Sequence, residues 1–190
     1  MSKGIVGSLL VGSVVAALSM PVFAGDDSGK VNFTGRILAD TCEINVDDSG
    51  NNEGTVTFAD TYPSDYNGIG SVGTSKAFKI EVTKCDPLIA KLNLRFNGTT
   101  SDSESLRLVN DLSGAGSATN VGISVKNENG TPSNVKFDGS DPDSGTDVAN
   151  DATGEAASVF NYTANVIQVG DYLPTAGKYS ASASFEVVYR

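Results

Sequence analysis

Apolar and polar residues alternate in short runs along most of this chain. Alternation with a period of two places every second side chain on one face of an extended strand. Such runs cover residues 55–58, 78–83, 92–96, 106–109, 121–125, 135–137, 159–166 and 179–189. Glycine, asparagine and aspartate separate them, and no run after residue 24 shows sustained helical periodicity. The pattern predicts an all-β protein built as an antiparallel sandwich.

The earliest alternating run, Gly29-Lys30-Val31-Asn32-Phe33-Thr34, has no neighbour in sequence that can pair with it. Its alternation places Gly29, Val31 and Phe33 on one face. Gly35 leads straight into another strand-like run, residues 36–39, rather than into a hairpin. The last run, residues 179–189, also has no partner after it. We therefore expect the first strand to pair in a neighbouring copy of the protein.

The N-terminus has the pattern of an export signal. Lys3 supplies a positive charge, residues 5–18 are apolar or small, and Val22-Phe23-Ala24 provides small residues before a cleavage point. The apolar stretch is shorter than the roughly 20 residues that a membrane-spanning helix needs. We predict a signal peptide over residues 1–24 and a mature chain that begins at Gly25. The remainder has the size of one domain.

The net charge indicates which partners are disfavoured, and the cysteine content indicates an oxidising compartment. The chain has 23 acidic and 13 basic residues, a formal net charge of −10, which disfavours nucleic acid and anionic membranes as partners. Its two cysteines, Cys42 and Cys85, are predicted to form a disulfide in an oxidising compartment, with both residues buried near strand ends. Closing a loop of about 44 residues should contribute roughly 4 kcal/mol in the chain-entropy model.

The sequence offers little for catalysis or metal binding. Histidine is absent, so no Ser-His-Asp triad or histidine metal site is possible. No glycine-rich phosphate loop or G-x-S-x-G motif is present. In the acidic segment 138–155, Asp141, Asp143 and Asp147 resemble a calcium ladder, but the closing glutamate of an EF-hand is missing. We predict an exposed loop there, no cofactor and no enzymatic activity.

A glycan-binding module is the main alternative. Tyr62 and Tyr66 share one loop, and tyrosine rings can stack on the apolar faces of ligands. The stronger stacking residue, tryptophan, is absent. The competing interpretation is that both tyrosines cover an edge of the sandwich.

Several motifs, in this order and spacing, give the chain a family resemblance. They are Gly29-x-Val31-x-Phe33-x-Gly35, Thr41-Cys42, Phe78-x-Ile80-x-Val82-x-x-Cys85, Phe96-Asn97-Gly98, residues 116–122, Pro174-x-x-Gly177 and Phe185-x-Val187-x-Tyr189. With them the whole mature chain resembles the subunits of chaperone–usher fimbriae, most closely the major pilins of the type 1 kind. The terminal Arg190 and the long segment 138–155 depart from that pattern.

The resemblance implies an incomplete immunoglobulin-like sandwich that lacks its final strand and so leaves a groove beside the C-terminal strand. In that family a periplasmic chaperone lends a strand to the groove, and the N-terminal extension of the next subunit replaces it at an outer-membrane usher. Residues 25–34 would be the donor strand and residues 35–190 the pilin domain. Phe185, Val187 and Tyr189 would line the groove edge and contact the chaperone.

The function implied is that of a structural fimbrial subunit exported through the periplasm to the cell surface, where it supports adhesion. Its partners would be copies of the same pilin, the chaperone, the usher, and tip adhesin or adaptor subunits. The alternatives are a secreted glycan-binding β-sandwich, a minor or adaptor pilin, and an enzyme of unrecognised type.

Overall fold

The computed structural model describes residue 34, residues 42–151, residue 153 and residues 155–190. We call the described part from residue 42 onward the body. The predicted signal peptide and the predicted donor residues Gly29, Val31 and Phe33 lie outside the described residues. Within the described ranges, no helix is long and apolar enough to cross a membrane.

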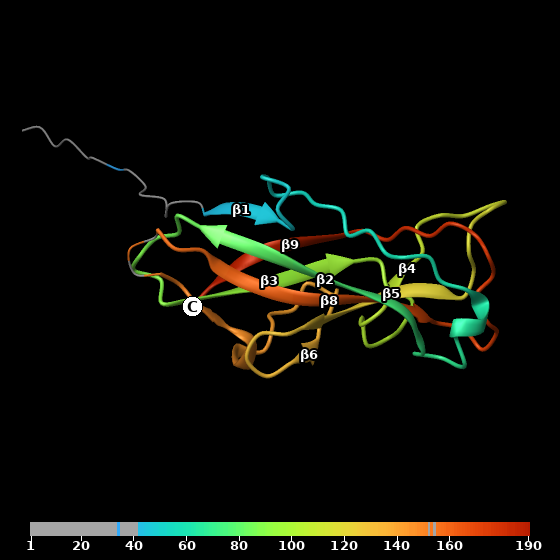
Figure 1. Ribbon diagram of the computed structural model, residues 1–190. Helices are drawn as coiled ribbons and strands as arrows, with labels where there is room; N and C mark the ends of the chain where they lie inside the picture. Colours follow the sequence, from blue (N-terminus) through green and yellow to red (C-terminus); the bar gives the residue numbers. More distant parts are fainter. Residues whose placement is uncertain (1–33, 35–41, 152, 154) are drawn as a thin grey trace, which may run out of the picture. The chain divides into compact units, whose positions relative to one another are not determined.

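Two antiparallel sheets make up the body (Figure 1). The larger sheet has the strand order β1-β2-β8-β5-β4, with β6 paired to β5, and the smaller has the order β7-β3-β9. The strands of the larger sheet are β1 (Glu43–Val46), β2 (Val72–Thr83), β4 (Leu108–Val109), β5 (Val121–Asn127), β6 (Ser133–Asn134) and β8 (Ser158–Gln168). Those of the smaller sheet are β3 (Lys91–Gly98), β7 (Val148–Ala149) and β9 (Ala183–Tyr189). Two short 3-10 turns, η1 (Pro63–Asp65) and η2 (Ser144–Thr146), lie in the connecting loops.

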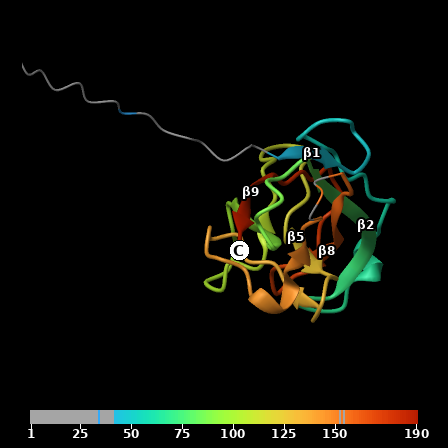
Figure 2. The same cartoon turned by 90° about the vertical axis from the view of Figure 1, so that its left-hand side faces the viewer.

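The longest pairing joins β2 to β8 and organises the larger sheet. In its register Phe78 faces Tyr162, and their rings stack with centroids 5.3 Å apart. Every ladder between named strands is antiparallel. In Figure 2, β9 lies on the opposite side of the body from β2 and β8.

The core fills the space between the two sheets. Phe96 of β3 contacts Tyr162 edge-on across this space, with ring centroids 5.4 Å apart. The most deeply buried apolar side chains come from β2, β3 and β8, and they are Ile80, Val82, Leu92, Leu94, Phe160, Tyr162 and Val166. They occupy alternate positions, as the period-two pattern predicts. Two antiparallel sheets packed face to face, the smaller with three strands, form an incomplete immunoglobulin-like sandwich. The predicted fold class is confirmed.

Strand boundaries differ from the sequence prediction where no neighbouring strand is available. The runs at 78–83, 92–96, 121–125 and 159–166 all lie in strands. Residues 55–58 were predicted to be a strand and belong to none, because no described strand lies beside them to pair. Residues 135–137 and 179–182 are likewise outside strands.

The predicted disulfide joins Cys42 to Cys85, with the two Cα atoms 4.4 Å apart. Cys42 immediately precedes β1 and Cys85 follows the end of β2, so the bond ties together the ends of two paired strands. The pairing is confirmed. Cys85 is buried as predicted, whereas Cys42 is half-buried because it precedes the sheet edge.

The acidic segment 138–155, described over residues 138–151, 153 and 155, has more regular structure than the predicted exposed loop. It contains η2 and β7, and Thr146 is buried. The buried amide of Asn93 donates hydrogen bonds to Thr146 Oγ1 at 3.0 Å and to Asp147 Oδ1 at 2.7 Å. These bonds hold the segment against β3. No group of three metal-ligating side chains occurs among the described residues.

Candidate assembly groove

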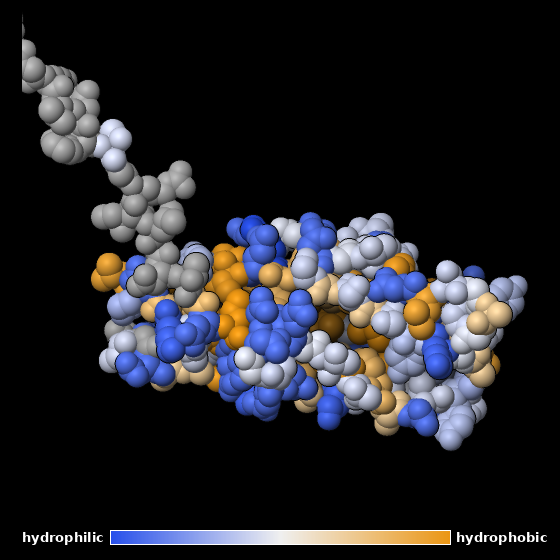
Figure 3. All heavy atoms as spheres, turned by 90° about the horizontal axis from the view of Figure 1, so that it is seen from above, coloured by the Kyte–Doolittle hydropathy of each residue, from blue (hydrophilic) through white to orange (hydrophobic). Residues whose placement is uncertain are grey.

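A long hollow opens on one face of the body, between residues 54–58 and the chain that leads into β9. Its volume is about 960 Å³. Figure 3 looks down on this face, where apolar side chains lie in the hollow between more polar surroundings. Among the described residues that line it, Glu53 is the one charged side chain. We call this hollow the groove.

The first wall is the segment 54–58, which alternates as a strand does but pairs with none. Val56 and Phe58 turn inward and pack against the core, while Thr55 and Thr57 are exposed. The backbone groups of this segment form no backbone hydrogen bond with any described residue. The N–H and C=O groups of this wall therefore have no backbone partner among the described residues.

The second wall is β9 together with residues 179–182. Lys91 and Arg190 exchange two backbone hydrogen bonds of 2.9 Å at the end of the β3–β9 ladder. In an antiparallel ladder, hydrogen-bonded pairs alternate with non-hydrogen-bonded ones. The register of this ladder therefore points the N–H and C=O groups of Ala183, Phe185 and Val187 away from β3, toward the open edge.

The floor of the groove is the core itself. Ile80, Ile123, Val125 and Ala164 reach it from the larger sheet, and Phe96 reaches it from β3. Each of these side chains is nonetheless buried by its neighbours. Along the groove, the sandwich lacks one strand that would cover this floor. An apolar strand placed in the groove would bury its side chains against the floor.

Two aromatic rings meet across the groove. Phe58 on the first wall and Tyr179 on the second have ring centroids 6.2 Å apart. Burial raises the pKa of the Tyr179 phenol, and the nearby Tyr66 and Asp60 raise that pKa further. Each wall therefore places one aromatic ring against the other across the groove.

The predicted groove-edge residues occupy three different environments. Phe185 lines the groove and contacts Phe96, with ring centroids 5.8 Å apart. Val187 packs against the core but lies outside the residues that line the groove. Tyr189, expected to face inward, is 46% exposed, because it ends the strand beside Cys42, where its hydroxyl is 3.7 Å from the cysteine sulfur.

Sequence reasoning did not assign Phe58 to this site, whereas it placed Tyr179 in the run 179–189 at the groove edge. The alternation at residues 55–58 was visible, but it predicted a paired strand. A pattern of this kind indicates which side chains turn inward and does not show whether a partner strand exists.

The two tyrosines of the glycan hypothesis lie in unlike environments. Tyr62 is exposed, but Tyr66 is buried, and a Cβ at Gly73 would clash with its ring. Only one of the two rings is therefore open to a ligand.

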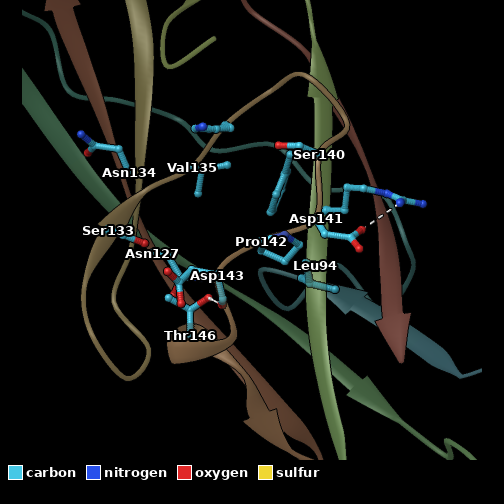
Figure 4. Close-up of a pocket in the computed structure, with 13 residues that line it drawn as sticks. Leu94, Asn127, Ser133, Asn134, Val135, Ser140, Asp141, Pro142, Asp143 and Thr146 are labelled. Carbon is cyan, nitrogen blue, oxygen red and sulfur yellow. Dashed lines mark hydrogen bonds and ion pairs between the residues drawn. The ribbon is translucent and has the colours of Figure 1, made fainter. Parts of the chain in front are cut away.

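A second, smaller hollow of about 390 Å³ lies between β3, β6 and the segment around Pro142 (Figure 4). At its edge Arg95 forms ion pairs with Asp141 at 3.0 Å and with Glu186 at 2.6 Å. Asn127 lines it from β5 and accepts a hydrogen bond from the Asn129 backbone N–H. The two ion pairs of Arg95 tie the segment around Asp141 to β3 and β9 of the smaller sheet.

The fold and the groove together define a class of protein, the pilins, whose sandwich is incomplete. A family described as fimbrial protein matches residues 31–190, and the chain belongs to that family. The chain is 34% identical over 166 residues to a type-1 fimbrial protein subunit of Serratia marcescens, covering 86% of this chain and 87% of that protein. It is 28% identical over 188 residues to a type-1 fimbrial protein A chain of Escherichia coli, covering 98% and 96%.

Solved structures agree with this assignment. A chaperone–usher pilus subunit has 27% identity and a TM-score of 0.58, over 87% of this chain and 98% of that one. The P pilus rod subunit PapA has 26% identity and a TM-score of 0.56, over 85% and 100%. The chain is accordingly a structural pilin subunit of a chaperone–usher fimbria, and it assembles with other subunits at the cell surface. This family indicates a structural rather than an enzymatic role.

Proposed function

We propose that this subunit polymerises by donor-strand complementation, in which Gly29, Val31 and Phe33 of one copy fill the groove of the next. The observation that carries the proposal is the pair of walls, residues 54–58 and the open edge of β9, on either side of an apolar floor. A strand laid between them would find backbone partners on both sides.

The chemistry of the predicted donor matches this groove. Val31 and Phe33 offer apolar side chains to an apolar floor, each worth roughly 1.5 to 3 kcal/mol when buried. Gly29 has no side chain, which allows its backbone to approach the floor closely. Such a contact is head-to-tail and does not close on itself, so it generates a filament.

An open groove is also an aggregation hazard before assembly. The proposal therefore includes a signal peptide over residues 1–24, passage through the periplasm, and a chaperone that covers the groove until an outer-membrane usher exchanges it for the donor strand. Phe185 and its neighbours on β9 would be the chaperone's contact. Tip adhesin or adaptor subunits would end the filament.

A strand-exchange assay tests the proposal with the variant Val31→Asp, Phe33→Asp. Because these side chains would be buried only in a neighbour, we expect the variant to accept a wild-type donor strand but to fail as a donor itself. The readout is the formation of subunit complexes when the variant is mixed with wild-type protein in each role.

Lys30→Asp is the matched control, since residue 30 alternates to the opposite face of the donor strand. It should donate and accept as the wild type does. Failure of the double variant in both roles would show that Val31 and Phe33 belong to the core of their own subunit, and the proposal would be wrong.

A further inference from the structure

The smaller hollow of the body contains a buried side chain with an unused donor group (Figure 4). Asn127 lines this hollow and is only 5% exposed. Its Oδ1 accepts hydrogen bonds from the backbone N–H and from the side-chain amide of Asn129, both at 2.8 Å. These two donors fix the orientation of the Asn127 amide, because the reverse orientation would place N–H groups against them. The Nδ2 of Asn127 donates to no described residue.

The other buried polar side chain that lines the hollow is satisfied. The Thr146 hydroxyl donates to the Asp143 carbonyl at 2.8 Å and accepts from Asn93 at 3.0 Å. Among the described residues, the buried side-chain atoms sealed from solvent without a partner are two tyrosine hydroxyls. The Nδ2 of Asn127 is not one of them, so this group opens onto the hollow that the residue lines. Because buried donors are almost always paired, it indicates a missing acceptor.

The backbone of β3 adds one donor and one acceptor to the same hollow. Leu94 and Phe96 line it, and the register of the β3–β9 ladder points their N–H and C=O groups away from β9. The Leu94 N–H donates to the side chain of Asn93, and the Phe96 carbonyl accepts from the Gly139 N–H. The Leu94 carbonyl and the Phe96 N–H have no backbone partner among the described residues.

This open part of the β3 edge is closed at both ends. β7 pairs with β3 at Lys91 and Leu92, and Asn97 forms a bridge to Asp138. The edge between them spans residues 93–96, whereas strands most often have about five to six residues. The hollow has a volume of about 390 Å³. Small-molecule pockets measure roughly 300 to 1,000 Å³, so the geometry favours a small ligand over an added peptide strand.

The charges around the hollow balance. Arg95 forms ion pairs with two neighbouring carboxylates. Lys136 and Asp143 contribute one further charge of each sign, and the buried side chains of Leu94 and Val135 add apolar surface. A hydroxyl group both donates and accepts hydrogen bonds. A neutral ligand with several hydroxyl groups and one apolar face therefore matches these donors, acceptors and charges together.

We propose that the smaller hollow binds a single neutral hexose unit at the end of a glycan chain. The sugar hydroxyl groups accept from Asn127 Nδ2 and from the Phe96 N–H, and they donate to the Leu94 carbonyl and to the Asp143 carboxylate. Neither Asn127 nor Asp143 lines the groove. The inference therefore does not depend on how the subunits assemble.

Saturation-transfer NMR on purified filaments of the full mature chain tests the proposal. The probes are methyl α-mannoside, methyl β-glucoside and methyl β-galactoside, and we expect at least one of them to receive magnetisation from the protein. Methyl β-glucuronide should bind more weakly than methyl β-glucoside, because its charge must be desolvated without a cation reserved for it. Binding of none of the three neutral probes would overturn the proposal, as would binding of a tetra-alanine peptide alone.

Two substitutions remove single hydrogen-bonding groups. Asp143→Asn keeps an oxygen for the Gly145 N–H, which Asp143 Oδ1 accepts at 2.7 Å, but it replaces the other carboxylate oxygen by a donor. We expect it to weaken sugar binding on the order of tenfold, since hydrogen bonds to charged groups are the stronger ones. Asn127→Leu removes the unused donor and should weaken binding about fivefold.

A third variant fills the hollow without changing a buried residue. Ser133 is exposed and lines the hollow, so the larger side chain of Ser133→Leu should abolish binding. Ser64→Leu is the matched control, because Ser64 is also exposed but lies in η1, outside the hollow. If Ser133→Leu and Asp143→Asn both bound the sugar as tightly as the parent, the sugar would lie elsewhere and the proposal would be wrong, even if Asn127→Leu did not fold.

Discussion

At the scale of single residues, the body depends on polar groups whose burial the sequence pattern does not reveal. Arg190, the last residue, donates to Asp147 Oδ1 at 3.1 Å and to the Pro142 carbonyl at 2.7 Å. The side chain of Asp147 is only 4% exposed and also accepts from Asn93. Arg190 therefore anchors the acidic segment at Pro142 and Asp147.

Tyr162 combines a buried aromatic ring with a buried hydroxyl group. Its ring is sandwiched between Phe78 and Phe96, yet its hydroxyl is buried without a hydrogen-bond partner among the described residues. Leaving a buried hydroxyl unpaired costs about 1 to 3 kcal/mol. We predict that Tyr162→Phe raises the free energy of unfolding by about 1 kcal/mol in urea denaturation.

The same substitution should change the alkaline stability of the protein. Burial raises the pKa of Tyr162 above its ordinary value of 10.0. Above about pH 10 the unfolded chain can ionise this tyrosine while the folded chain cannot, so stability falls as the pH rises. Tyr162→Phe should make that fall less steep. The exposed Tyr62→Phe is the control, and equal effects at the two positions would contradict the explanation.

At the scale of elements, the disulfide reinforces an edge strand that has few other attachments. β1 has four residues and pairs only with β2 among the described strands. The bond lies at the point where the chain enters this strand, and its cysteines are 43 positions apart in the sequence. Its loss would leave β1 held by its ladder with β2, and the first wall of the groove begins at residue 54, after the turn that follows β1.

We predict that Cys42→Ala with Cys85→Ala lowers the free energy of unfolding by about 4 kcal/mol, the chain-entropy value for a loop of this length. Denaturant titration of the oxidised parent and the variant measures the difference. A reduced parent that matches the double variant would show that the bond itself is responsible. Two free thiols in denatured, unreduced protein would contradict the pairing.

At the scale of the whole molecule, the groove makes the subunit incomplete until another strand arrives. Removing residues 185–190 would test the groove edge poorly, because it also takes away the strand that pairs along β3. A proline on the open side of β9 is a sharper test. The ladder alternation points the Ala183 N–H into the groove and the Ser184 N–H toward β3.

We predict that Ala183→Pro leaves the subunit folded but weakens its binding of a synthetic peptide of residues 25–34 by about fivefold to tenfold, the value of one lost hydrogen bond. Calorimetric titration of the peptide measures the change. Ser184→Pro is the matched control and should instead lower the stability of the body. If the two variants had the same effect on stability, the assignment of the open edge would be wrong.

The sequence alone determined the elements that depend on local pattern and on chemical type. Alternation identified the long strands β2, β3, β5 and β8, because a side-chain period of two is visible without knowing the partner strand. The pairing of Cys42 with Cys85 followed from there being two cysteines. The absence of histidine removed the commonest catalytic base.

Only the tertiary structure decided which runs are paired and which remain open. Residues 55–58 alternate as clearly as β5 does, yet they lie at an edge where no described strand is beside them, so they form a wall of the groove. Tyr62 and Tyr66 are of one residue type in one loop, but packing buries only the second. Strand pairing and side-chain burial depend on which segments, distant in sequence, lie side by side. Tertiary packing of the whole chain determines this, and no local pattern does.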